Sequence, residues 1–194
     1  MKKFELTTEF ITNFLGTKLF RIKALVEFGK VEKGELGGFV EKEENLDHDG
    51  DAWVSGNAWV YGDARVYGDA EVYGDAEVSG NARVYGDARV YGDAWVYGDA
   101  WVSGNAWVSG NAWVSGDQMY ATVKGFGSEY RNTTFFITKD GNVCVNCGCF
   151  SGTLEQFREK VEETHKDTKY AKEYLMIADL MEMHFKEELE KIKK

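Results

Sequence analysis

The chain has 194 residues, of which 43% are hydrophobic and 29% charged, so its composition is that of a globular rather than a disordered protein. No apolar run approaches the roughly 20 residues that span a bilayer, and the opening MKKFELTTEF carries acids where a signal peptide has its apolar centre. The net charge of −10 is concentrated between Asp51 and Asp117, where ten acids accompany three arginines and no lysine. We therefore expect a cytoplasmic protein that binds neither membranes nor, directly, nucleic acid, since both require a basic surface.

Residues 1–50 predict an N-terminal cap. One or two strands are followed by a first irregular coil, in which Val40 and Leu46 already show a six-residue step. Such a cap is needed because the end strands of a solenoid otherwise leave backbone hydrogen-bonding groups open.

Residues 51–117 consist of a six-residue repeat, A-x-V-[YS]-G-[DN]. Alanine recurs from Ala52 to Ala112 and valine from Val54 to Val114, eleven times each without an insertion. The period of two in a strand places alanine and valine on one side and the x and Tyr/Ser slots on the other. The Gly-[DN] pair supplies a corner, because these residues tolerate left-handed backbone. Three hexads per coil predict a triangular parallel solenoid of nearly four coils, roughly 18 Å long.

Residues 118–194 predict a small α+β domain. TTFFITKDGNVCVNCG is typical of a β-hairpin that turns at Asp140-Gly141, with positive φ at both turn residues. Thr153 and Gln156 form a capping-box pattern that begins a helix, and a longer helix follows from about Lys169. This domain is expected to cap the solenoid or to mediate assembly.

The hexads resemble the hexapeptide-repeat superfamily, in which a small residue follows an aliphatic one four positions later, as with Val84 and Ala88. That resemblance implies a left-handed parallel β-helix, a trimeric homo-oligomer and binding sites in clefts between subunits. The segments LFRIKALVEFGKVEKGELGGFVEKEENL and FFITKDGNVCVNCGCFSGTLEQFREKVEETHKDTKYAKEYL are similar to YdcK-like β-solenoid proteins of phages and prophages. This second resemblance implies a phage setting, in which small proteins often bind and block host factors.

An acyltransferase is the enzymatic alternative, because the hexapeptide superfamily includes such enzymes. They use a histidine general base beside a loop that projects from a corner. The hexads here contain neither histidine nor loop, and His48 precedes them in the irregular coil. The histidines are also too scattered for the three-histidine zinc site of γ-class carbonic anhydrases. We predict no catalytic residue.

Three cysteines, Cys144, Cys147 and Cys149, lie within six positions. An odd number of crowded thiols does not indicate a disulfide framework. With His165 they have the composition of a structural Cys₃His zinc site. The alternative is that they are small buried side chains of a strand core.

The tryptophans carry the functional hypothesis, because all six occupy the outward x slot. Three of them, Trp95, Trp101 and Trp107, fall on different faces of one coil, and Trp113 follows Trp95 on its face. Aromatic surface of this extent invites association. Three explanations remain open: packing on the protein's own flanks, with the tail domain folded over the tryptophans; self-association; or a cleft that binds a planar ligand or a host protein. The candidate binding residues are Trp95, Trp101, Trp107, Trp113, Tyr91, Tyr97, Arg65, Arg83 and Arg89.

The sequence therefore predicts a non-enzymatic β-solenoid binding protein, phage-encoded and homo-oligomeric, that sequesters or blocks a host factor. The expected partner is a nucleotide-like small molecule or a host immune protein, which would give the protein a counter-defence role. The alternatives are a hexapeptide-type acyltransferase and a purely structural oligomerisation protein.

Overall fold

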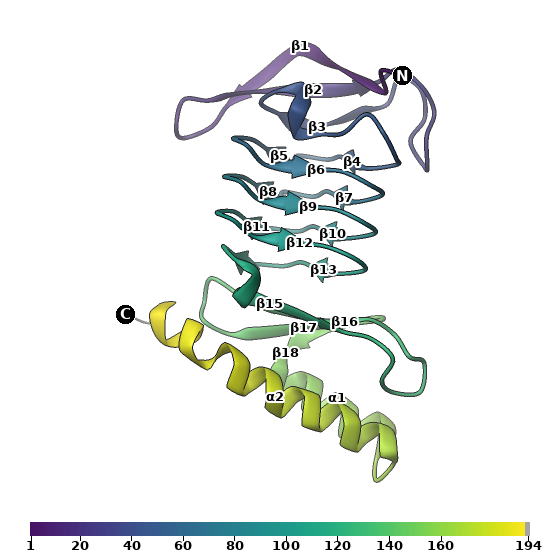
Figure 1. Ribbon diagram of the computed structural model, residues 1–194, viewed down its shortest axis with the longest axis vertical. Coiled ribbons are helices and arrows are strands. Elements are labelled where there is room, and N and C mark those ends of the chain that lie inside the picture. Colours follow the sequence, from purple (N-terminus) through teal and green to yellow (C-terminus); the bar gives the residue numbers. More distant parts are fainter. Residues whose placement is uncertain (193–194) are drawn as a thin grey trace. The chain divides into compact units, whose positions relative to one another are not determined.

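The protein is a mainly β molecule of two compact units, Met1–Asn111 and Ala112–Lys194. The structure is a computed structural model that describes residues 1–192. Within the first unit, Figure 1 shows short strands stacked coil upon coil beneath a cap of longer strands. The second unit combines a small antiparallel sheet with two helices. Neither helix in this described range has an apolar stretch long enough to cross a bilayer.

The solenoid is built from two-residue strands, each formed by the x and valine slots of one hexad. A strand pairs with the strand three hexads further along the chain, as Val60 does with Val78, so three hexads complete one coil as predicted. The strands of the first unit form three parallel sheets, ordered β5-β8-β11, β4-β7-β10-β13 and β6-β9-β12. Their bounds are β4 Trp53–Val54, β5 Trp59–Val60, β6 Arg65–Val66, β7 Glu71–Val72, β8 Glu77–Val78, β9 Arg83–Val84, β10 Arg89–Val90, β11 Trp95–Val96, β12 Trp101–Val102 and β13 Trp107–Val108.

The interior of the solenoid contains the alanine and valine slots, which confirms the predicted parity. Val54 and Ala58 have no exposed surface, and the same holds for their equivalents through Val108. The corner glycines of this unit have φ between 62° and 75°, a left-handed conformation that favours glycine. Stacking adds a second constraint, because a Cβ on Gly50 would lie 2.3 Å from the carbonyl oxygen of Gly68.

Three longer strands and a short 3₁₀ turn form the N-terminal cap, where one or two strands were predicted. They are β1 (Phe4–Thr12), β2 (Lys18–Ala24), β3 (Leu36–Val40) and η1 (Glu43–Asn45). β1, β2 and β3 are antiparallel, and β3 then pairs in parallel with β5 through Phe39 and Trp59. Leu46 bridges Val66 in the same way. The first irregular coil thus enters the sheets of the solenoid.

The cap also satisfies the carbonyl groups at the open end of the solenoid. Each coil donates its N–H groups to the following coil, so the carbonyls of the first coil need other donors. The Lys3 ammonium donates to the carbonyls of Gly50 (3.1 Å) and Ala52 (2.9 Å). The Asn45 amide donates to those of Gly62 (3.1 Å) and Ala64 (2.9 Å). Two side chains from the cap therefore replace a missing strand.

Trp53 occupies the outward slot, as predicted, but other residues of the protein cover it. Trp53 points away from the solenoid interior but is only 5% exposed, because Phe4 and Phe28 pack edge-on against it. Trp59 is half-buried against a cluster of Leu19, Phe39 and Tyr61. The first two tryptophans are therefore covered by residues of the N-terminal cap. Packing on the protein's own flanks was one of the three open explanations, and it named the tail domain as the cover.

The second unit starts with β14 (Trp113–Val114) and η2 (Asp117–Met119). An antiparallel sheet follows, ordered β15-β16-β17-β18, with bounds Tyr120–Val123, Thr133–Ile137, Val143–Cys147 and Phe150–Thr153. The helices are α1 (Leu154–His165) and α2 (Lys169–Ile192), close to the predicted positions. Thr153 and Gln156 form both hydrogen bonds of the predicted capping box. Phe157 of α1 packs edge-on against Phe135 and Tyr174 in the core.

The hairpin between β16 and β17 differs from the predicted two-residue turn. Thr138 and Asn142 close a loop of three residues, Lys139 to Gly141, through the hydrogen bond from the Thr138 N–H to the Asn142 carbonyl. Only Gly141 has positive φ among these loop residues, at 70°. This combination is typical of a type I turn followed by one left-handed residue.

Candidate functional site

The outward x slots form one column on each face of the solenoid, because paired strands place their x residues side by side. Each column has a different chemical character. The glutamate face contains Phe39, Trp59, Glu77 and Trp95. The ion-pair face contains Trp53, Glu71, Arg89 and Trp107. The arginine face contains Arg65, Arg83 and Trp101.

The glutamate face is closed at its N-terminal end. Tyr61 is buried there with Leu19 and Phe39, and its hydroxyl donates a hydrogen bond to Glu77. Burial, and secondarily this hydrogen bond, raises the pKa of Tyr61 to about 12. Trp95 at the other end of this column is 48% exposed.

The ion-pair face has its charges matched within the column. Arg89 Nε lies 3.3 Å from a Glu71 carboxylate oxygen, and Lys30 Nζ lies 3.6 Å from the other oxygen. The Arg89 guanidinium also lies over the Trp107 ring, 5.1 Å from its centroid. This arginine is therefore already occupied by internal partners.

The positive charges of the arginine face have no ion-pair partner within that face. Arg65 and Arg83 are direct neighbours in the parallel ladder, and within residues 1–192 neither forms an ion pair or a hydrogen bond through its side chain. Like charges opposite each other in a sheet are unfavourable. Arg83 stacks over the ring of Trp101, 4.8 Å from the centroid, and Trp101 remains 43% exposed. The face thus presents two guanidinium groups beside an exposed indole.

Two carboxylates beside this face, Asp63 and Asp99, interact with other side chains. Lys42 Nζ lies 2.9 Å from Asp63 Oδ1, and the Asn81 amide donates to Asp99 Oδ1 at 3.0 Å. The hydrogen bond to Lys42 is also the main cause that lowers the pKa of Asp63. The charge of Arg65 also contributes to the lowered pKa of Asp63, and Glu44 and Asp47 line the first cleft with the two arginines.

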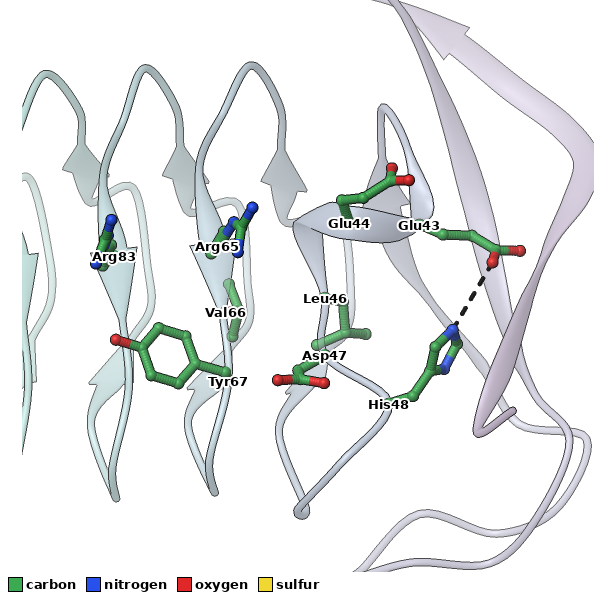
Figure 2. Close-up of a pocket in the computed structure, with 9 residues that line it drawn as sticks. All are labelled: Glu43, Glu44, Leu46, Asp47, His48, Arg65, Val66, Tyr67 and Arg83. Atoms are coloured by element: carbon green, nitrogen blue, oxygen red, sulfur yellow. Dashed lines mark ion pairs between the residues drawn. The ribbon is translucent and has the colours of Figure 1, made fainter. Parts of the chain in front are cut away.

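The neighbouring pair of Arg65 and Arg83 is called the arginine rung below. Two clefts lie beside this pair, and both are lined by Arg65, Arg83 and Glu44. The first has a volume of about 510 Å³ and is bounded by Leu46, Asp47 and Tyr67 (Figure 2). The second has a volume of about 620 Å³ and reaches Lys42 and Trp101. Tyr67 stacks on Tyr85 with the ring centroids 4.9 Å apart, which extends the aromatic surface. Clefts of this size match those that hold small molecules.

His48 lines the first cleft but is built into the cap. Its Nδ1 accepts a hydrogen bond from the backbone N–H of Lys3 at 3.2 Å, and its ring packs on Phe4 with centroids 4.4 Å apart. Its Nε2 lies 3.7 Å from Glu43, and Figure 2 shows the ring turned toward that residue. These contacts give His48 a structural role in the cap.

The structure brings some of the predicted binding residues together and separates others. Arg65, Arg83 and Trp101 share one face, whereas Arg89 and Trp107 lie on another. Tyr91 stacks on Tyr73, 4.9 Å between centroids, beside the ion-pair face. Tyr97 and Trp113 are half-buried, and Trp113 belongs to the second unit.

Sequence reasoning missed several residues that line the clefts. Tyr67 lines the first cleft, and Tyr85 stacks on it. Both follow an arginine in the repeat, so their spacing of three hexads could have placed them on the same face. Lys42 and Glu44 lie in the irregular coil, where no repeat signal gives their position.

The cysteines and His165 are placed in different surroundings. Cys144 and Cys147 are three positions apart in β17, so they project to opposite sides of the strand. Cys147 accepts a hydrogen bond from Thr133 Oγ1 at 3.1 Å, and Cys149 is exposed in the following turn. His165 packs against Tyr170 and Tyr174. Over the described part of the chain, no three His, Cys, Asp or Glu residues converge as metal ligands. The zinc site stays a prediction.

Comparison with known proteins supports the β-solenoid assignment. A family model described as the YdcK β-solenoid repeat matches residues 82–98, 88–104 and 100–116, all within the hexads. No curated protein matches the chain. The repeat match and the stacked parallel coils together identify this chain as a β-solenoid protein.

Proposed function

We propose that this β-solenoid is a non-enzymatic binding protein that captures a planar, phosphate-bearing small molecule on its arginine face. The observation that carries the proposal is the rung of Arg65 and Arg83, whose guanidinium groups are neighbours without an ion-pair partner in the described chain. A bound anion would turn this unfavourable pair of charges into a favourable site.

The chemistry of the ligand follows from the side chains of the face. Two guanidinium forks suit the several oxygens of a phosphate, because each fork can donate two parallel hydrogen bonds. The exposed indole of Trp101 and the stacked Tyr67 and Tyr85 offer flat surfaces for a planar group. A nucleotide-like molecule contains both elements.

The overall charge of the protein limits the size of the anion. The repeat region is strongly acidic, so an extended polyanion such as DNA or RNA would be repelled along most of its length. A small ligand with one or two phosphates avoids this repulsion, because it contacts only the arginine rung.

The biological setting of the proposal comes from the resemblance of the flanking segments to YdcK-like proteins of phages and prophages. In this setting, the protein sequesters a host signal molecule and so weakens a host defence response. A hydrolytic or transfer step is not part of the proposal, because His48, the histidine that lines the first cleft, is held by the cap.

Binding can be tested by titration calorimetry with adenosine monophosphate, adenosine and inorganic phosphate. We expect adenosine monophosphate to bind more tightly than either fragment. Arg65→Gln and Arg83→Gln should each weaken binding about 10- to 100-fold, the range for a hydrogen bond to a charged group. Arg89→Gln is the matched control, because Arg89 occupies the same slot on the ion-pair face, and it should change affinity less than about twofold.

Two results would count against the proposal. Equal losses in Arg83→Gln and Arg89→Gln would mean that general charge, rather than the arginine face, drives binding. Absence of binding by all three probes, together with arginine-dependent capture of a host protein, would replace the small molecule by a protein partner.

A further inference from the structure

The outward surface of α2 is apolar at its centre. The buried side of this helix contains Ala171, Tyr174, Ile177, Ala178, Met181 and Phe185. On the opposite side, Met176, Leu180 and Met183 are 72%, 49% and 68% exposed. The outward side of a surface helix normally has polar residues, so three large apolar side chains there indicate a contact surface.

These three residues belong to a longer stripe that changes charge from one end to the other. The α2 stripe consists of Lys169, Lys172, Met176, Leu180, Met183, Glu187 and Glu190, all exposed. At 100° per residue they fall within an arc of about 80°, and they extend over about 32 Å of helix. The stripe is therefore basic at its start, apolar in its middle and acidic at its end.

We propose that α2 pairs antiparallel, through this stripe, with the same helix of a second copy of this chain. The stripe is nearly symmetric about a point between Asp179 and Leu180. An antiparallel copy places Met176 against Met183 of the partner subunit. It also places Lys172 against Glu187 of the partner subunit, and Lys169 against Glu190 of the partner subunit.

The arrangement has the self-complementarity that a two-fold dimer requires. Each contact occurs twice, because the same surface serves on both copies. A parallel pair would instead place lysine against lysine and glutamate against glutamate, which is unfavourable. The charge order of the stripe thus selects both the partner and its direction.

Neighbouring ion pairs leave the stripe available. Arg158 of α1 forms ion pairs with Asp179 and Glu182, which lie to one side of the stripe. Lys169 also contacts Glu173 at 3.4 Å, an exposed pair that costs little to rearrange. One helix pair buries less than about 1,200 Å² in total, so we expect a reversible, concentration-dependent dimer.

A charge-reversal series on the full chain tests the proposal by sedimentation over a range of concentrations. Lys172→Glu and Glu187→Lys should each weaken dimerisation about tenfold or more, because each places like charges together twice per dimer. The double variant Lys172→Glu/Glu187→Lys should restore the wild-type dissociation constant to within about threefold, because the opposite pairs form again with exchanged positions. Lys124→Glu, an exposed change away from the stripe, is the charge control.

Disulfide cross-linking in a Cys149→Ser background tests the direction of the pair. Leu180→Cys, close to the two-fold axis, should cross-link readily. Met176→Cys alone should cross-link poorly, whereas a mixture of Met176→Cys and Met183→Cys chains should give a mixed dimer.

Three outcomes would overturn the inference. The first is a monomer at the highest soluble concentration. The second is single charge variants that associate like the wild type. The third is an oligomer that dissociates in Trp95→Ala or Trp101→Ala but not in the α2 variants. That result would assign assembly to the solenoid. Unchanged circular dichroism of each variant separates loss of pairing from loss of folding.

Discussion

The rung formed by Arg65 and Arg83 places two positively charged side chains next to each other in the parallel ladder. We expect Arg65→Gln to raise the free energy of unfolding by about 0.5 kcal/mol, because it removes a like-charge contact of the ladder. Urea denaturation at low salt measures this change. Arg89→Gln should have the opposite sign, because Arg89 is paired with Glu71. A loss of stability in Arg65→Gln would show that the rung is not strained by repulsion.

Tyr61 and Glu77 form a buried polar pair on the glutamate face. Glu77 is 9% exposed and Tyr61 is 8% exposed, and the phenol donates to the carboxylate. Tyr61→Phe would leave this carboxylate without its donor, so we expect a loss of about 2 kcal/mol in the free energy of unfolding at pH 7. Tyr67→Phe, on the open arginine face, is the control and should change it by less than about 0.5 kcal/mol.

The same tyrosine predicts a decrease of stability at high pH. In the unfolded chain Tyr61 loses its proton near its ordinary pKa of 10.0, whereas the folded chain keeps the proton up to about pH 12. Between these values the unfolded state binds fewer protons, so the free energy of unfolding falls as the pH rises. Other tyrosines contribute in the same direction, and the slope should therefore become shallower, without vanishing, in Tyr61→Phe. An identical slope in both proteins would contradict this assignment.

The corner asparagines form side-chain hydrogen bonds between neighbouring coils. The amides of Asn57 and Asn81 donate to Asp75 and Asp99, one coil further along, at 3.1 and 3.0 Å. Asn105 donates to Asp87 at 3.4 Å in the other direction. An asparagine in a column of aspartates therefore replaces repulsion between carboxylates with a hydrogen bond.

At the scale of elements, the N-terminal cap depends on single side chains. Asn45 has no exposed surface and provides both protons of its amide to the carbonyls of Gly62 and Ala64. We expect Asn45→Ala to lower the free energy of unfolding by about 2 to 4 kcal/mol, because two buried acceptors lose their donors. Thermal or urea denaturation measures this loss.

Asn81→Ala provides the control for the cap variant. Asn81 is exposed and makes a hydrogen bond to Asp99 at a corner, so its loss should cost no more than about 1 kcal/mol. Similar losses in the two variants would mean that the first coil obtains its donors elsewhere, and that Asn45 does not cap the solenoid.

Elements that depend on neighbouring residues were predicted well. The Thr153 and Gln156 capping box requires only residues three apart, and the parity of the hexads requires only alternation. The hairpin loop was predicted less well, because Asp-Gly suits both a two-residue turn and the end of a three-residue loop. The cover over Trp53 could not be predicted, since Phe4 and Phe28 lie far from it in sequence.

At the scale of the whole molecule, the repeat determined what could be predicted about the arginine face. A spacing of three hexads is enough to assign Arg65, Arg83 and Trp101 to one face, and the ladder pairing shows them there. The same spacing places Arg89, another candidate binding residue, on the ion-pair face instead. The clefts themselves depend on η1 and the coil before the hexads, where the sequence has no period. Long-range contacts of irregular segments therefore set the limit of prediction.

The corner between hexads also restricts how the faces of the solenoid can change when hexads are gained or lost. Each face returns after three hexads, so duplication of one coil would lengthen every column by a step and leave its order intact. Insertion of a single hexad between Arg65 and Arg83 would preserve the hydrophobic interior but rotate everything beyond it by one face. The two guanidinium groups would then point in different directions. Gain or loss of a whole coil would therefore keep the order of residues within each column, whereas gain or loss of one hexad would change it.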